Sequence, residues 1–260
     1  MVRSVIIDAG HGGVEPGAVY EGRKEKDDTL RLAFDLGNAL ERRGVQAEYT
    51  RVNDIYDSPY EKAAIANRSN ADVFISIHRN AMPVPGTASG IESLVYANQG
   101  TAGLLAQNIN KELESVGWKD LGVQERPGLV VLRQTQMPAV LVEAGFIDNP
   151  EDNTFFDQNL AATADAIADG IVKTFEELEK QQDLSVEVPG FFVGQTGIFR
   201  RREYAEELLE EMRERGFGGY ILVKQGLYYV RSGAFRELSN AIERERQLRR
   251  QGFDTLILRT

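Results

Sequence analysis

The chain of 260 residues has only two histidines, and each ends a run of β-branched and apolar residues. His11 closes the run 5–11, His78 closes the run 73–78, and a third run, 139–142, is followed at once by Glu143. Such runs predict buried strands, and ligands of open α/β sheets bind at the carboxyl ends of strands. We therefore expect these three side chains at one sheet edge, where they could hold a metal ion and transfer protons.

A hydrolytic zinc site needs a third protein ligand, because catalytic zinc keeps three protein ligands and one open position. The chain has no cysteine, so this ligand must be a carboxylate. Glu25 is preferred because it follows the glycine-rich loop 10–13 and directly precedes a predicted helix. Glu15, Glu21 and Asp28 remain open as alternatives.

The elements that position these residues belong to an α/β pattern, in which β-branched runs alternate with amphipathic helices from residue 3 to about 175. Strands separated by helices predict a mostly parallel, twisted sheet flanked by helices. Besides the three runs, we predict strands at 46–51, 90–96 and 129–132, and helices at 60–67, 101–115 and 160–178.

The sequence turns charged and polar before Pro189, which predicts a linker at 179–188 between domains at 1–178 and 189–260. The second domain contains an internal repeat. Gly197-Ile-Phe-Arg recurs 36 residues later as Gly233-Ala-Phe-Arg, and Gly216-Phe recurs as Gly252-Phe at the same offset. Each half predicts a strand, a charged helix and a strand, so we expect a small α+β domain of βαββαβ order, ferredoxin-like in type.

Composition excludes several functions. The net charge of −10 argues against nucleic acid and against an anionic membrane as partners. No apolar stretch is long enough for a transmembrane helix, and residues 1–4 pass directly into the first strand without the apolar region of a signal peptide. We therefore do not expect export by the general secretory route.

The glycine-rich block 8–18, together with Lys24-Glu25-Lys26-Asp27, resembles the zinc-dependent N-acetylmuramoyl-L-alanine amidases of the amidase 3 family. Three further blocks agree in the same order, at 65–72, 76–81 and 138–147. Four positions depart from the usual family pattern without removing a ligand: Ala9, Glu15, Lys62 and Arg79.

The resemblance implies that His11, Glu25 and His78 bind zinc and that Glu143 is the catalytic carboxylate. The reaction it implies is hydrolysis of the amide between N-acetylmuramic acid and L-alanine in peptidoglycan. Glu143 would take a proton from the attacking water and pass it to the leaving amine.

Other polar residues are expected around this centre. Asp8 precedes His11 closely enough to accept from a metal-bound imidazole, since such imidazoles normally donate their second N–H to a carboxylate or carbonyl. Asn67, Asn80 and Arg133 are expected to contact the substrate.

The C-terminal domain resembles the SPOR domain, a peptidoglycan-binding module. The matching marks are Phe192-Val193 with Gly197-x-Phe199, and residues 228–231 with Gly233-x-Phe235. Alternate residues of a strand face opposite sides, so only some of these aromatic side chains can be exposed.

The resulting hypothesis is a monomeric, cell-wall-lytic zinc amidase, either an autolysin of mother-cell lysis or a phage-type lysin. It would act in the cell wall or outside the cell, after release without a signal peptide from the mother-cell cytoplasm. The alternatives are a zinc peptidase that cleaves another wall-peptide amide and a non-catalytic peptidoglycan-binding protein.

Overall fold

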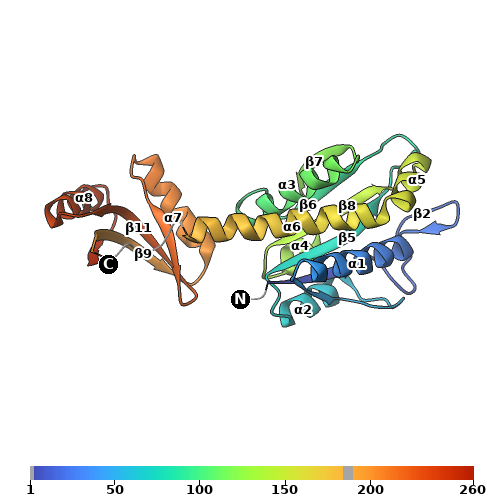
Figure 1. Ribbon diagram of the computed structural model, residues 1–260, viewed down its shortest axis with the longest axis horizontal. Helices are drawn as coiled ribbons and strands as arrows, with labels where there is room; N and C mark the ends of the chain where they lie inside the picture. Colours follow the sequence, from blue (N-terminus) through green and yellow to red (C-terminus); the bar gives the residue numbers. More distant parts are fainter. Residues whose placement is uncertain (1–2, 184–189) are drawn as a thin grey trace. The chain divides into compact units, whose positions relative to one another are not determined.

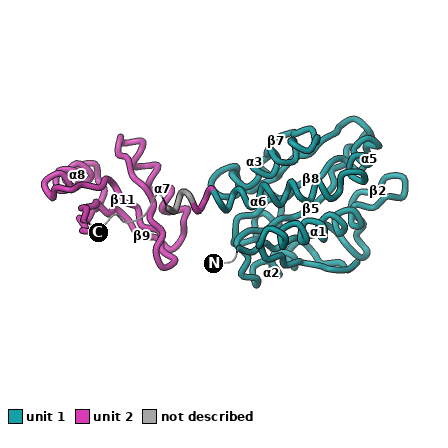
Figure 2. The backbone as a smooth tube through the Cα atoms, viewed as in Figure 1, with its two compact units in different colours: residues 1–176 teal, residues 177–260 magenta. Residues whose placement is uncertain are grey.

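The computed structural model describes residues 3–183 and 190–260 (Figure 1). The chain divides into two compact units, Met1–Glu176 and Glu177–Thr260 (Figure 2). Helix α6 (Leu160–Asp183) ends within the stretch 179–188 that was predicted as a linker. The rest of that stretch, 184–188, lies outside the described residues.

The first unit contains a six-stranded sheet with the strand order β4-β1-β5-β8-β6-β7. Its strands are β1 (Ser4–Ala9), β4 (Gln46–Tyr49), β5 (Val73–Asn80), β6 (Ile91–Val95), β7 (Asp120–Glu125) and β8 (Ala139–Phe146). Neighbouring strands are parallel except β8 and β6, which pair antiparallel. The predicted α/β class and mostly parallel sheet are thus confirmed.

Helices cover both faces of this sheet, which explains why its central strands are continuously apolar. Helices α1 (Glu25–Arg42), α3 (Gly100–Ser115) and α6 pack against one face, through residues such as Leu36, Ile109 and Ile167. In Figure 1, α1 and α6 lie in front of the sheet. Helices α2 (Pro59–Arg68) and α4 (Val130–Gln134) cover the other face, where Ala66 and Val131 join a smaller core.

Three short elements complete the first unit. Strands β2 (Val19–Tyr20) and β3 (Arg23–Lys24) form a hairpin that leads directly into α1. Helix α5 (Pro150–Gln158) follows β8 and begins at Asn149, whose side chain accepts from the backbone N–H groups of Glu151 and Asp152.

One predicted strand is wrong. Residues 129–132 begin helix α4, because Val131 and Leu132 pack on the face that α2 also covers. A short apolar run does not distinguish a strand from a buried helical turn. The sixth strand of the sheet is β7, which pairs with β6 at the edge. Its largely polar sequence does not predict a strand.

The second unit has the predicted βαββαβ order. It contains β9 (Phe192–Phe199), α7 (Arg202–Glu214), β10 (Tyr220–Lys224), β11 (Leu227–Phe235), α8 (Leu238–Arg250) and β12 (Leu256–Arg259). The strands form an antiparallel sheet in the order β10-β11-β9-β12. Phe199 and Tyr228 pack against the core beneath the helices, and the neighbouring Tyr229 therefore faces the opposite side of β11.

The two halves of the repeat meet at equivalent positions. Phe217 and Phe253, which are counterparts in the repeat, pack edge to face with ring centroids 6.1 Å apart. Arg215 of the first half donates to the backbone carbonyl of Gln251, its counterpart in the second half. One small core is thus shared by both copies.

Candidate active site

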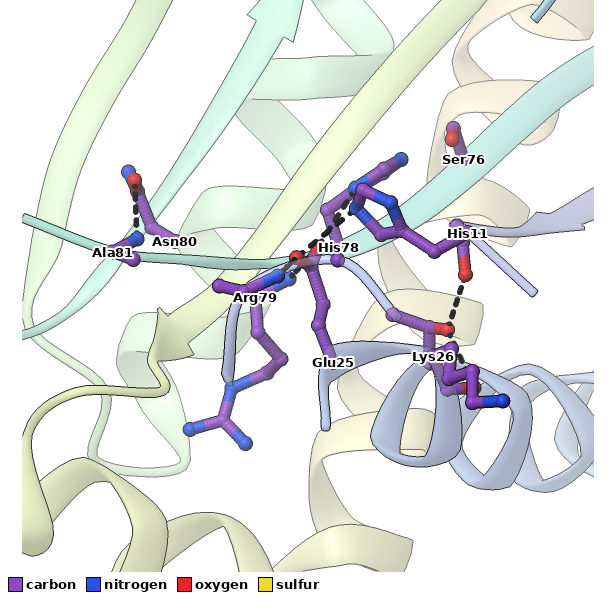
Figure 3. Close-up of polar contacts among 12 residues, drawn as sticks. His11, Glu25, Lys26, Ser76, His78, Arg79, Asn80 and Ala81 are labelled. Atoms are coloured by element: carbon purple, nitrogen blue, oxygen red, sulfur yellow. Dashed lines mark hydrogen bonds and ion pairs between the residues drawn. The ribbon is translucent and has the colours of Figure 1, made fainter. Parts of the chain in front are cut away.

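Three predicted metal ligands converge at the carboxyl end of the sheet. His11 lies in the loop after β1, Glu25 is the first residue of α1, and His78 belongs to β5 (Figure 3). Each offers one ligand atom, and these atoms lie within 4.8 Å of one another. His11 Nε2 is 3.0 Å from one carboxylate oxygen of Glu25, and His78 Nδ1 is 2.9 Å from the other. Two imidazoles and one carboxylate form a donor set that suits zinc.

Glu25 is held in place by backbone groups as well as by the two rings. Its carboxylate accepts from the N–H groups of Ala18 at 2.9 Å and Arg79 at 3.0 Å. Burial opposes ionisation of Glu25, but hydrogen bonds and charge from the two histidines outweigh it and lower its pKa. The side chain is therefore an anion ready to bind a cation.

The glycine-rich loop leaves room for this arrangement. A Cβ added to Gly10 would lie 2.5 Å from the ring of His78, and one added to Gly17 would lie 2.5 Å from a carboxylate oxygen of Glu25. Gly17 also has a φ of 69°. These positions need glycine because ligand side chains occupy the space that a Cβ would fill.

Glu15, one of the alternative ligands, has a different place. Its carboxylate contacts Nδ1 of His11 and accepts from the N–H of Gly17 at 3.1 Å. The sequence suggested Asp8 as the carboxylate beside an imidazole, but the structure gives this position to Glu15.

Asp8 is buried beneath the site and makes other contacts. Its oxygens accept from Thr50 at 2.6 Å, Ser76 at 2.7 Å and Lys62 at 2.8 Å. Burial opposes ionisation of Asp8, yet the charge of Lys62 and these hydrogen bonds leave its pKa lowered. Asp8 is therefore a buried anion that links Thr50, Ser76 and Lys62 beneath the site.

The other two alternative ligands also lie elsewhere. Glu21 is exposed in the turn between β2 and β3. Asp28 pairs with the buried Arg79 at 2.7 Å and with Arg23 at 2.6 Å. Glu25 is thus the carboxylate that joins the two histidines.

Arg79 follows His78 in the chain but points away from the two imidazoles (Figure 3). Its guanidinium stacks over Phe156, 4.2 Å from the ring centroid, and donates to Asn153 at 2.8 Å. Burial lowers the pKa of Arg79 to about 10, and the charge of Asp28 opposes that shift. The guanidinium of Arg79 is therefore directed away from the group formed by His11, Glu25 and His78.

Glu143 lies beside His78 in the register of β5 and β8. His78 lies four residues after Phe74, and Glu143 lies two residues after Leu141. Phe74 and Leu141 both belong to the core covered by α2 and α4. Because alternate residues of a strand share a face, the side chains of His78 and Glu143 point to that same side of the sheet. Within the described parts of the chain, Glu143 Oε2 is buried and has no hydrogen-bond partner. Burial raises the pKa of Glu143 to about 7; the charges of Glu25 and Glu92 add to this, and the histidines oppose it. A carboxyl with this pKa is suited to gain and lose a proton near neutral pH.

Glu92 is a site residue that the sequence did not reveal. It pairs directly with Glu143 across the antiparallel strands β6 and β8, and it accepts from the side-chain N–H of Asn80 at 2.7 Å. Its strand was predicted, but only the pairing register shows that it meets Glu143. Asn80 also accepts from the N–H of Ala81 at 2.8 Å (Figure 3).

The two other predicted substrate contacts lie near α4. Asn67 donates to the carbonyl of Gln134 and accepts from the N–H of Gln136, both at 2.8 Å. This amide thus ties α2 to the end of α4. Arg133 is exposed on α4. The structure does not bring either residue into the group formed by His11, Glu25 and His78.

None of the helices in the described parts of the chain has the length and apolar character needed to cross a membrane.

Comparisons with known proteins identify the families that both parts of the chain match. Residues 5–173 match the family model described as N-acetylmuramoyl-L-alanine amidase, and residues 189–259 match the SPOR domain. The chain is 34% identical over 229 residues to the sporulation-specific N-acetylmuramoyl-L-alanine amidase of Bacillus subtilis (strain 168), covering 85% of this chain and 84% of that relative. It is 35% identical over 183 residues to the endolysin of Bacillus phage SPP1, covering 66% of each chain. The crystal structure of N-acetylmuramoyl-L-alanine amidase from Clostridium difficile 630 aligns with a TM-score of 0.64 and 34% identity, covering 67% of this chain and 97% of that one.

Proposed function

Because the chain belongs to the N-acetylmuramoyl-L-alanine amidase family and carries a SPOR domain, we propose that His11, Glu25 and His78 hold one zinc ion and that Glu143 is its catalytic acid–base. The protein is a cell-wall-lytic amidase acting on peptidoglycan. The observation that supports this assignment is the convergence of the three ligand atoms within 4.8 Å, with Glu143 beside His78 in the strand register.

The chemistry divides between metal and protein. When bound, zinc supplies Lewis acidity, which lowers the pKa of a water molecule and polarises an amide carbonyl. Glu143 in its ionised form accepts a proton from the attacking water at Oε2. It then donates that proton to the nitrogen of the leaving L-alanine as the carbon–nitrogen bond breaks. Its pKa of about 7 fits both roles.

Substrate contacts are assigned by position. Asn80 would contact the peptide next to the leaving amine, which its hydrogen bond to Glu92, the strand neighbour of Glu143, supports. Arg133 is exposed on α4 and free to contact a carboxylate of the stem peptide. Asn67 would act through α4, because its amide is engaged with the backbone at Gln134 and Gln136.

The names of two relatives support a proposal for the biological setting. One relative is named sporulation-specific and another is a phage endolysin. We infer an autolysin that acts on the wall when a spore-forming mother cell lyses, with a phage-type lysin as the second role. The chain would act as a monomer, anchored on peptidoglycan by its SPOR domain. Pulse-labelling in the host would test the timing, since enzyme outside the cell long before lysis contradicts the autolysin role.

The decisive experiment uses purified peptidoglycan with zinc-free, zinc-restored and Glu143→Ala protein. We expect zinc-dependent release of N-terminal L-alanine without new reducing ends. Glu143→Ala should retain zinc and lose this activity, and full activity in that variant would refute the role of Glu143. Release of a different amino terminus would favour a zinc peptidase, and no release would favour a non-catalytic binding protein.

A further inference from the structure

A cavity of about 390 Å³ opens beside the metal ligands and has no role in the mechanism above. His11 and His78 form one wall, and the segment 56–59 before and at the start of α2 forms another. Residues 128–131 at the start of α4 close the third side. The volume falls within the usual range of small-molecule sites.

The lining of this cavity combines apolar walls with polar side chains, among them one carboxylate oxygen that is buried and unpaired among the described residues. Leu129, Val130 and Val131 supply apolar surface from α4, and Leu141 supplies more from β8. Asp57 also lines the cavity, and its Oδ2 is buried without a hydrogen-bond partner among the described residues. Such an oxygen is costly to leave unpaired, so a ligand that donates an N–H or O–H to it would gain stability. Tyr56 at the rim is 48% exposed and offers a ring face.

The loop that carries Tyr56 and Asp57 is fixed before any ligand arrives. Asp54 pairs with Lys26 at 2.6 Å and accepts from the N–H of Gly13 at 2.7 Å. The buried Arg51 donates to the carbonyls of Ala9 at 3.0 Å and Gly10 at 2.9 Å. The segment is thus tied to the same loop that carries His11, which reduces the ordering cost of binding.

The position of Glu143 indicates which half of the substrate extends toward the cavity. The cavity is lined by Asp8 of β1, His78 of β5 and Leu141 of β8. Glu143 lies two residues further along β8, toward the carboxyl end of that strand, and Glu92 pairs with it from β6. Glu143 does not line the cavity. The leaving amine must lie near Glu143 to receive its proton. The acyl group is on the other side of the same carbonyl carbon, so it extends toward the cavity.

We propose that this cavity is the subsite for the sugar of the acyl half, an N-acetylated muramic acid ring. Asp57 accepts a hydrogen bond from the acetamido N–H or a hydroxyl of the ring, and Tyr56 stacks on its apolar face. The α4 residues contact the acetamido methyl group. This assignment rests on the proposed function, because it uses the polarity of the amide that Glu143 cleaves.

The test measures binding of the two reaction products separately by titration calorimetry, with the full zinc-loaded chain. The probes are N-acetylmuramic acid and L-alanyl-D-glutamate. Asp57→Ala removes the acceptor, and Gly128→Leu narrows the cavity. A Cβ at Gly128 has no heavy atom of the described residues within 4 Å, so this variant is expected to fold. Asn53→Ala, an exposed change in the same loop, is the control.

Asp57→Ala and Gly128→Leu should each weaken binding of N-acetylmuramic acid about tenfold, as expected for loss of a hydrogen bond to a charged group or of cavity space. Binding of the dipeptide should change less than twofold, and Asn53→Ala should change neither. Weaker dipeptide binding with unchanged sugar binding would assign the cavity to the peptide and overturn the proposal. So would unchanged binding of both products, or a wild-type chain that does not bind the sugar. Failure of the proposed function would appear separately, as absence of L-alanine release from peptidoglycan by the wild-type chain.

Discussion

The carboxylate of Glu15 contacts Nδ1 of His11, while Nε2 of the same ring faces Glu25 at 3.0 Å. A carboxylate at Nδ1 holds the proton there and leaves Nε2 as a lone-pair donor. In the proposed zinc site, Glu15 would therefore orient His11 for metal binding without being a ligand itself.

Substituting Glu15 should weaken the metal site. Loss of such a partner typically costs about 10–100-fold in metal affinity, so Glu15→Gln should raise the zinc dissociation constant by this factor. Competition with a chelator measures it. Glu21→Gln changes an exposed glutamate of the β2–β3 turn and should leave affinity unchanged. Equal affinities in both variants would show that Glu15 has no orienting role.

The buried Glu143 should lower the free energy of unfolding of the zinc-free protein at neutral and higher pH. Its folded pKa of about 7 lies above its ordinary value of 4.5, so the free energy of unfolding falls as pH rises from about 4.5 to 7 and then levels off. Glu143→Gln mimics the protonated form. At pH 8 its free energy of unfolding should exceed that of the wild-type chain by about 3 kcal/mol, given about 1.4 kcal/mol per pKa unit. Denaturant titrations at pH 4 and pH 8 test this, and the difference should vanish at pH 4. A wild-type chain as stable as the variant at pH 8 would contradict it.

Arg79 should be required for the stability of the first unit. Arg79→Met removes the guanidinium from Asp28 and Asn153 and leaves buried polar groups with fewer partners. Breaking a buried pair in this way costs about 3 kcal/mol. Arg31→Met changes an exposed arginine that lies 3.8 Å from the same Asp28, so it should cost less than about 0.5 kcal/mol. Thermal unfolding measures the stability of both variants. Similar losses of stability would mean that the buried contacts of Arg79 do not stabilise the first unit more than the exposed contacts of Arg31 do.

Gly233 should matter for the second unit alone. Its φ is 69°, and an added Cβ would lie 2.4 Å from the ring of Phe235. Gly226 has a similar φ of 74°, but an added Cβ there meets no heavy atom of the described residues within 4 Å. Gly233→Ala should therefore destabilise this unit more than Gly226→Ala, by about 1–3 kcal/mol. Retention on peptidoglycan should fall, while hydrolysis of a soluble muramoyl peptide stays unchanged. Equal effects of the two variants would exclude the steric cause.

Local sequence patterns predicted most of this architecture because strand ends carry their residues to a common edge. His11, His78 and Glu143 follow apolar runs, and Glu25 starts a helix, so their meeting could be expected. The role of Glu92 depends on which residue faces it across β6 and β8, and pairing register is not a local property.

Two further differences between prediction and structure, at Glu15 and at the start of α4, also arise because local sequence does not determine the outcome. Glu15 was considered as a ligand because its residue type was right, but the direction of a side chain in an irregular loop is fixed by distant contacts such as that of Gly13 with Asp54. The start of α4 has too few residues to show a helical period.

The contact between Phe217 and Phe253 has a consequence for the origin of the second unit. In a two-fold symmetric dimer, a residue near the axis meets its own counterpart on the other subunit. Here one chain reproduces that geometry internally, with Arg215 and Gln251 repeating the pattern. The unit has the organisation of a fused homodimer of βαβ halves. An ancestral half of about 36 residues would have buried its apolar surface only by pairing with an identical copy.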